Sequence, residues 1–322
     1  MIKVYPLLDT LEVLDISDES YFNDYKDYIS NSRLSLINPD QGGSVEKYLA
    51  KEKLSSGSLL LGSAIHAEIL QPGEFNIIGG VNRPTAKLGL MADELAKYYP
   101  ADITDEMIIE ASNKVDYYRG KMNPNRITDV RTKCQNYWAM RKDITGDNNL
   151  FLDDASYIKY KGCVESVKGN SDIQSLLHPE GLFEEPIVKN ELAITILFEA
   201  VNTETGEVKT LPFKAKLDNF TITEGDTAVL NDLKSTGHLL VDFPESFKKY
   251  HYNRQMAVYS WLLLNASKKF TELPISSCTA NMLVVSTVPD FHSQVFKVKR
   301  SEIIKGFSEF VYLLHKVAEI YV

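Results

Sequence analysis

Two acidic residues and a lysine stand in a pattern that suits metal-assisted chemistry. The stretch KAKLDNFTITEGDTAVLNDLKST places Asp218 at the end of one expected strand and Asp232, Leu233 and Lys234 on the next. Because side chains alternate along a strand, Asp232 and Lys234 point to the same face, and a turn around Gly225 brings Asp218 beside them. Burying two acids and a lysine is costly unless something pairs with them, so we expect a divalent metal in this cluster.

The reaction that such a cluster supports is hydrolysis of a phosphodiester. Carboxylates are hard oxygen ligands that suit Mg²⁺, with Mn²⁺ as a substitute. Lys234 beside the metal is placed to orient or deprotonate the attacking water and to stabilise developing negative charge. However, an Asp-x-Lys pair on a strand is usually a solvated ion pair worth about 0–1 kcal/mol, so further residues are needed to support this function.

Three further features point to the same chemistry. Gln255 and Tyr259 are four residues apart and therefore share one helical face, with Tyr252 one turn before Gln255. His66 stands alone in an otherwise apolar helix, and Glu191 lies near the start of the first expected strand. Each also has a simpler interpretation, since a lone histidine on an apolar helix usually belongs to the core and a Gln/Tyr pair can cap one. Their order along the chain favours a common site.

The elements that carry these residues divide the chain into a helical first half and an α/β second half. Apolar residues recur at three- and four-residue steps in the first half, and predict helices over 17–37, 59–70, 85–99, 104–120, 127–143 and 153–169. Strand patterns then predict an antiparallel meander over 187–200, 208–222 and 227–235. A helix over 244–267, strands over 277–287 and 293–299 and a helix over 301–321 follow.

This order predicts an α/β fold with a central mixed sheet flanked by helices. We expect one domain over residues 1–322, with N-terminal helices in 17–78, a helical insert in 79–180 and an α/β catalytic core in 187–322. No repeat or Gly/Ser/Pro linker interrupts it.

Composition excludes several classes of protein. With 322 residues, 44% hydrophobic, 25% charged and a net charge of −9, the chain reads as an ordinary globular protein. No run approaches about 18 apolar residues and acidic residues occur within the first ten positions, so we expect a cytoplasmic protein without a membrane span or cleaved signal. The scattered Cys134, Cys163 and Cys278 fit neither a disulfide framework nor an iron–sulfur cluster. No phosphate-loop motif provides an ATP site.

Together these residues resemble the PD-(D/E)XK nucleases of the RecB type, and among them the exonuclease VIII (RecE) group. The segments that carry the resemblance are SNSRLSL (30–36), LGSAIHAEILQP (61–72), KAKLDNF (214–220), LNDLKST (230–236) and YHYNRQMAVYSWLL (250–263). The resemblance covers residues 30–75 and 187–300, and residues 80–180 have no recognisable counterpart. Leu217 stands where the family name has proline, a common substitution in this superfamily.

The resemblance implies a restriction endonuclease-like core and a role for each site residue. The implied metal ligands are His66, Asp218, Asp232 and the backbone carbonyl of Leu233, and Glu191 completes the site or binds a second ion. Lys234 then acts on the water, while Gln255 and Tyr259 support the lysine and contact the DNA backbone. Further implied or candidate DNA contacts are Ser32, Arg33, Lys248, Lys249, Tyr252 and Arg254.

The activity implied is that of a Mg²⁺-dependent exonuclease acting on double-stranded DNA ends in recombination or repair, of phage or mobile-element type. Such relatives form rings that thread DNA, which predicts a homo-oligomer, and a single-strand annealing protein is an expected partner. A basic stretch in the insert either lines the DNA path or is simply solvated; it contains Arg119, Lys121, Arg126, Arg131 and Lys133.

Two alternatives stay open at this point. One is a structure-specific or nonspecific endonuclease that serves as the nuclease partner of a helicase. The other is a non-catalytic DNA-binding homologue. Cleavage of linear but not closed-circular DNA separates the exonuclease from the endonuclease, because an exonuclease requires an end.

Overall fold

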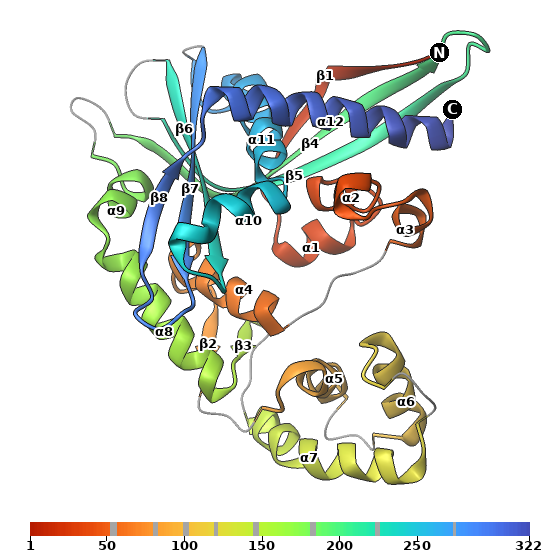
Figure 1. The fold of residues 1–322 in the computed structure, drawn as a ribbon, viewed down its shortest axis with the longest axis vertical. Coiled ribbons are helices and arrows are strands. Elements are labelled where there is room, and N and C mark those ends of the chain that lie inside the picture. Colours follow the sequence, from red (N-terminus) through yellow and green to blue (C-terminus); the bar gives the residue numbers. More distant parts are fainter. Residues whose placement is uncertain are drawn as a thin grey trace. The chain divides into compact units, whose positions relative to one another are not determined.

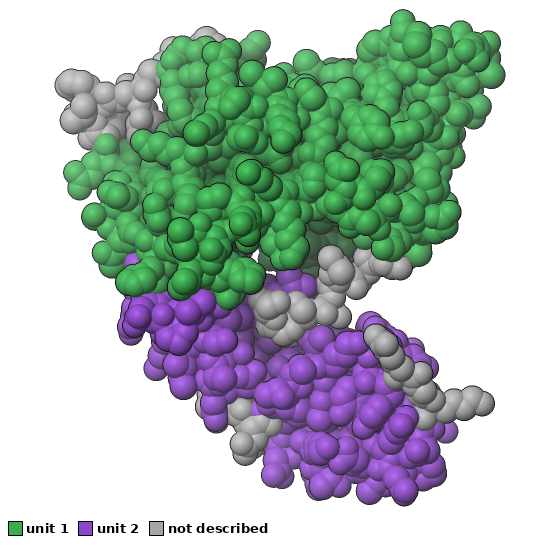
Figure 2. Space-filling model, in the orientation of Figure 1, with its two compact units in different colours: residues 1–52, 167–286, 292–322 green, residues 53–166, 287–291 purple. Residues whose placement is uncertain are grey.

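The computed structural model describes residues 1–51, 57–79, 83–98, 103–118, 122–143, 148–180, 185–222, 226–272 and 275–322. The chain divides into two compact units (Figure 2). The larger contains residues 1–52, 167–286 and 292–322, and the smaller contains residues 53–166 and 287–291. The division expected from the sequence, one domain with an insert at 79–180, stays a prediction.

The larger unit is built on a six-stranded mixed sheet in the order β1-β4-β5-β6-β7-β8 (Figure 1). Its strands are β1 (Ile2–Leu14), β4 (Ile187–Asn202), β5 (Val208–Ile222), β6 (Thr227–Thr236), β7 (Ser277–Ser286) and β8 (Ser293–Lys297). β6 and β7 are parallel, and the other neighbours are antiparallel. The predicted mixed sheet and its antiparallel meander are therefore confirmed. The turn expected around Gly225 lies outside the described residues.

The sequence pattern missed strand β1, which lies at one edge of this sheet. Its register with β4 shifts between Leu7 and Glu12, and such an irregularity interrupts the alternation by which a strand is recognised. Pro6 also argues against a strand, but an edge strand tolerates proline because one side of its backbone needs no partner. Because of this irregularity, the sequence pattern did not predict this strand of 13 residues.

Two expected helices of the larger unit are divided in the structure, whereas the helix expected over 301–321 is confirmed as α12 (Arg300–Tyr321). The other helices of this unit are α1 (Asp18–Asn23), α2 (Asn31–Ser35), α3 (Val45–Ala50), α9 (Ser171–Leu177), α10 (Phe243–Lys249) and α11 (Tyr252–Ala266), with short 3-10 turns η1 (Pro39–Gln41), η2 (Leu240–Asp242) and η3 (Ser267–Lys269). The helix expected over 17–37 is two short helices. The helix expected over 244–267 is broken at His251, whose φ of 53° is left-handed.

The break at His251 depends on a contact that is distant in sequence. His251 Nδ1 lies 2.7 Å from Glu309 Oε1 on α12. α12 approaches the start of α11 closely at Gly306, where an added Cβ would lie 2.2 Å from the Asn253 carbonyl oxygen. A left-handed conformation is unfavourable for residues other than glycine, so local propensity alone does not predict it.

The main core lies between the sheet and the helices α11 and α12. Phe213 on β5 packs edge-on against Phe310 of α12, with ring centroids 5.4 Å apart, and both contact Phe198 of β4. Trp261 of α11 stacks on Phe198 from the helical side. These rings fix α11 on the sheet.

The smaller unit is mainly helical, with a minimal sheet. It contains α4 (Gly57–Leu70), α5 (Ala86–Ala96), α6 (Asp105–Lys114), α7 (Pro124–Asp143) and most of α8 (Asp154–Gly169). Strands β2 (Asn76–Ile78) and β3 (Asn149–Phe151) pair in parallel. The sequence pattern did not predict these two strands, because three-residue strands are too short to show a period. None of the described helices is long and apolar enough to cross a membrane.

Two described residues of the basic stretch pair with acids of the smaller unit. Arg131 pairs with Asp105 at 2.7 Å, and Lys133 pairs with Asp129 at 2.8 Å. The guanidinium of Arg126 lies 4.4 Å from the centroid of the Tyr118 ring. Arg119 and Lys121 lie outside the described residues. These partners favour the solvated interpretation of the stretch.

Candidate metal centre

The structure brings together the acid, the second acid and the lysine that the sequence singled out. β5 and β6 pair from Ile222↔Ala228 to Asn219↔Asn231, so Asp218 and Asp232 are the first positions beyond this ladder. The carboxylate of Asp218 accepts the N–H of Leu233 at 2.9 Å. Asp232 is fully buried.

Lys234 bridges the two carboxylates. Its Nζ lies 2.6 Å from Asp232 Oδ2 and 3.8 Å from Asp218 Oδ2. Burial alone would lower the pKa of Lys234, but the carboxylates of Asp232 and Asp218 raise it above its ordinary value. The lysine is therefore protonated at neutral pH, and suits the stabilisation of negative charge.

Helix α11 supplies the expected Gln and Tyr to the same cluster. Gln255 Nε2 donates to Asp232 Oδ1 at 2.8 Å, so the amide contacts the acid and holds its orientation. Tyr259 is buried on the same helical face, and burial, together with Tyr21, Asp232 and Asp218, raises its pKa well above the ordinary value. The ring centroid of Tyr252 lies 5.8 Å from Lys234 Nζ.

Glu191 stands directly opposite Asp218 in the register of β4 and β5, between Asn190↔Asn219 and Leu192↔Leu217. Its φ of 51° is left-handed. Such strain in a glutamate costs about 1–3 kcal/mol and concentrates at functional sites. Its carboxylate Oε2 lies 2.6 Å from Lys216 Nζ.

Sequence reasoning missed two members of the cluster, Lys216 and Asp18. Lys216 pairs with both Glu191 and Asp18 of α1. Burial would lower the pKa of Lys216, but Glu191 and Asp18 raise it. Alternation along KAKLD places Lys216 on the same strand face as Asp218, so the sequence pattern could have predicted Lys216 as a member of the cluster. Nothing in the sequence pattern indicated Asp18.

The donor set fits a hard divalent cation. Glu191 and Asp218 each offer one carboxylate oxygen, and these two atoms lie within 4.8 Å of each other. His66 of α4 belongs to the smaller unit and stays a predicted ligand. Imidazole nitrogen and carboxylate oxygens are ligands that such cations accept. The carbonyl oxygen of Leu233, also a predicted ligand, lies 3.3 Å from Lys234 Nζ.

The charges of the cluster give a second reason to expect a cation. Among the described residues, these ion pairs join four carboxylates to two lysines and so carry two more negative than positive charges. The carboxylates are those of Asp18, Glu191, Asp218 and Asp232, and the lysines are Lys216 and Lys234. Partly buried charge of one sign is costly unless it is neutralised. One divalent cation would balance it.

A row of asparagine side chains fixes the strands that carry the carboxylates. The Nδ2 of Asn281 donates to Asn231 at 3.0 Å, Asn231 donates to Asn219 at 2.7 Å, and Asn219 donates to Asn190 at 2.7 Å. The row crosses β7, β6, β5 and β4, one residue away from Asp232, Asp218 and Glu191 in their strands. Because a one-residue slip would break every bond of the row, it holds the site residues in register.

The predicted DNA contacts differ in their exposure. Ser32, Lys248 and Lys249 are exposed. Arg33 is partly exposed; its Nη1 donates to the carbonyl of Asp27 at 2.8 Å, and its guanidinium lies 4.7 Å from the Tyr48 ring centroid.

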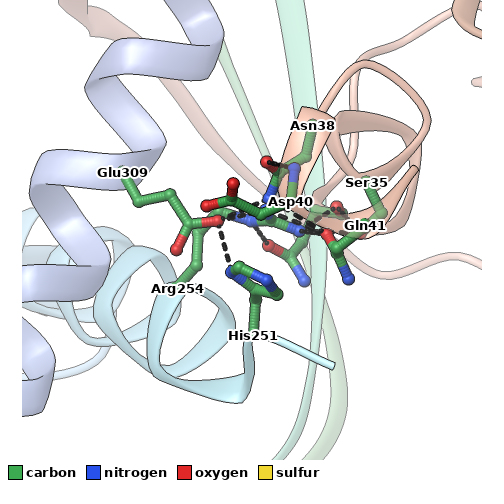
Figure 3. A network of polar contacts seen from close by, with 8 residues as sticks. Ser35, Asn38, Asp40, Gln41, His251, Arg254 and Glu309 are labelled. Atoms are coloured by element: carbon green, nitrogen blue, oxygen red, sulfur yellow. Dashed lines mark hydrogen bonds and ion pairs between the residues drawn. The ribbon is translucent and has the colours of Figure 1, made fainter. Parts of the chain in front are cut away.

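Arg254 requires a correction, because it is fully buried. Its Nε donates to Asn31 Oδ1 at 2.8 Å, Nη2 to Ser35 Oγ at 2.7 Å and Nη1 to Glu309 Oε1 at 2.7 Å. Figure 3 shows this guanidinium enclosed between α2, α11 and α12. Helical spacing does not reveal which polar residue faces inward. Arg254 joins helices and is not accessible to a DNA backbone.

Comparisons with known proteins give no family for this chain. No protein-family model and no curated protein matches it. A crystal structure of an Eubacterium rectale protein, described provisionally as an exonuclease, is similar over 96% of this chain and 88% of that chain, with 12% identity and a TM-score of 0.49. The crystal structure of SSO0001 is similar over 80% of this chain and 85% of that chain, with 12% identity and a TM-score of 0.22. Neither likeness is strong enough to assign an activity, which has to be inferred from the side chains.

Proposed function

We propose that this protein is a metal-dependent nuclease of the PD-(D/E)XK type that hydrolyses phosphodiester bonds of DNA. The observation that supports this best is the cluster of Asp218, Asp232 and Lys234, in which Lys234 Nζ lies 2.6 Å from Asp232. Gln255 contacts the same acid at 2.8 Å. An acid-rich, buried cluster beside a protonated lysine suits both a hard cation and a phosphate.

The residues divide the work of hydrolysis. Bound Mg²⁺, or Mn²⁺ in its place, would supply charge for the phosphate oxygens and a more acidic water. The proposed ligands are His66, Glu191, Asp218, Asp232 and the Leu233 carbonyl. Lys234 orients the water and stabilises the negative charge that develops on the phosphate. Gln255 holds Asp232 in orientation, and Tyr259 closes the buried side of the cluster.

Within this class we propose an exonuclease that starts at ends of double-stranded DNA during recombination or repair. Its proposed setting is the bacterial or phage-infected cytoplasm, as a ring-shaped homo-oligomer working with a single-strand annealing protein. The resemblance of the motifs to the RecE group supports these finer assignments. Ser32, Arg33, Lys248 and Lys249 are the proposed DNA contacts that retain exposure.

The test compares matched linear and closed-circular duplex DNA with Mg²⁺, Mn²⁺ or EDTA. We expect metal-dependent loss of the linear DNA alone, and no loss with Lys234→Ala. Lys268→Ala, at an exposed lysine of η3, is the matched control and should keep full activity. Cutting of the circle would replace the exonuclease by an endonuclease. DNA binding without any cleavage would contradict the catalytic function.

A further inference from the structure

A line of aromatic side chains leads from the proposed active site to the protein surface. The Tyr252 ring centroid lies 5.8 Å from Lys234 Nζ, and the Tyr250 ring centroid lies 5.7 Å from that of Tyr252. Tyr252 also packs on Phe243 and Phe247, at 6.1 and 6.2 Å. The inner end of the line is thus held by the core, whereas Tyr250 is 46% exposed.

The backbone presents Tyr250 in a fixed place. His251, between the two tyrosines, adopts the left-handed conformation that separates α10 from α11. The 2.7 Å contact of its Nδ1 with Glu309 holds this turn against α12. The turn therefore holds the backbone that carries Tyr250, and a preorganised backbone lowers the entropy lost on binding.

A positive charge accompanies the exposed ring. Lys249 Nζ lies 5.3 Å from the centroid of Tyr250 and is itself exposed. Proteins bind single-stranded nucleic acid by combining aromatic rings, on which bases stack, with basic residues that follow the phosphates. Stacking tolerates any base, because every base has a π-face.

We infer that Tyr250 is a stacking site for an unpaired base of the DNA strand whose phosphodiester lies at Lys234. Lys249 contacts a phosphate of the same strand. This inference rests on the proposed nuclease function and adds to it a substrate feature, namely a locally unpaired strand leading to the site. A frayed or single-stranded end provides such a strand.

The test measures the affinity of the full-length protein in EDTA for a duplex with a single-stranded end that carries 2-aminopurine. Tyr250→Ala should weaken binding roughly 5- to 150-fold and should remove the fluorescence quenching of the 2-aminopurine. Tyr250→Phe keeps the ring and should keep both signals. Because Tyr250 is exposed, the alanine variant should unfold at the same temperature as the parent.

The chain provides a close control at Tyr312 on α12. Tyr312 is 51% exposed and has a lysine nearby, with Lys316 Nζ 5.8 Å from its ring centroid. Tyr312→Ala should bind the DNA as the parent does. Lys249→Gln should lower the slope of log affinity against log salt by about 0.7, whereas Tyr250→Ala should leave that slope unchanged.

The outcomes separate this inference from the proposed function. If Tyr250→Ala binds and quenches as the parent does, while the parent still cleaves DNA with Mg²⁺, the stacking site is wrong and the nuclease stands. If the parent neither binds nor cleaves DNA, both fail.

Discussion

Two buried polar clusters begin from neighbouring residues of α11 and differ in their balance of charge. Arg254 opens a cluster in which one guanidinium meets one carboxylate, Glu309, among neutral hydrogen-bonding groups such as Asn31 and Ser35. Gln255 contacts the other cluster, in which four carboxylates meet two lysines. A balanced cluster is complete in itself, whereas an acid-rich one is arranged for a cation. The difference distinguishes a structural network from a candidate site.

The strongest test of the difference between the two clusters is to neutralise one acid of the candidate site. Asp218→Asn keeps an oxygen for the Leu233 N–H but lowers the negative charge, so we expect hydrolysis to fall by about 10³-fold. The free energy of unfolding in EDTA should stay within about 1 kcal/mol of the parent or rise, because repulsion is relieved. Activity assays and urea unfolding measure the two effects. A large loss of stability in EDTA would mean that the acid is structural.

The Arg254 cluster should respond in the opposite way. Arg254→Met leaves Glu309 without its guanidinium, and breaking a buried pair costs about 3–5 kcal/mol. Urea unfolding of the variant should show that loss, and Arg254→Met with Glu309→Leu should recover part of it. Mn²⁺ affinity of the folded variant should match that of the parent. Unchanged stability would remove the structural role given to Arg254.

A variant at His66 tests whether the candidate site binds a metal ion through this side chain. His66→Ala removes a predicted nitrogen ligand, so Mn²⁺ affinity, measured by electron paramagnetic resonance, should fall by at least about 10-fold. His178→Ala, at an exposed histidine, is the control and should leave the affinity unchanged. Equal affinities in the two variants would exclude His66 from the site.

Lys214 on β5 is a third type of buried charge, and its expected effect is on the pH dependence of stability alone. Its Nζ donates to the Tyr21 carbonyl at 2.7 Å, and burial lowers its pKa from 10.5 to about 8. Between those two values the unfolded chain holds the proton and the folded chain does not, so the free energy of unfolding gains a contribution that rises with pH. In Lys214→Met that contribution should be absent. Urea unfolding of parent and variant at pH 8 and 10.5 measures the difference, and parallel pH curves would contradict it.

The central sheet and the main residues of the candidate site could be predicted from the sequence, because they depend on local patterns. Alternation and turn residues place Asp218 beside Asp232 and Lys234, and helical spacing places Gln255 and Tyr259 on one face. The structure brings these residues together, while their catalytic roles stay predictions. The same alternation could have predicted that Lys216 belongs to this cluster.

Other features depend on contacts that are distant in sequence. The break at His251 is held by Glu309, and the segment around it has neither the glycine nor the proline that would signal a break. Arg254 resembles a surface arginine until α2 and α12 are packed around it. The ion pair between Glu191 and Lys216 and the strained backbone of Glu191 likewise arise only when β4 and β5 are aligned.

The pairing of β1 with β4 has a consequence for the order of events during synthesis. β1 ends at Leu14 and its partner begins at Ile187. At a rate of about 5–20 residues per second, the ribosome completes β1 on the order of 10 s or more before β4 exists. Throughout that interval the strand lacks its partner, whereas residues 53–166 of the smaller unit emerge as one continuous segment. The nascent chain is therefore exposed to mispairing and to chaperone binding at its first strand, and the sheet can be completed only late in translation.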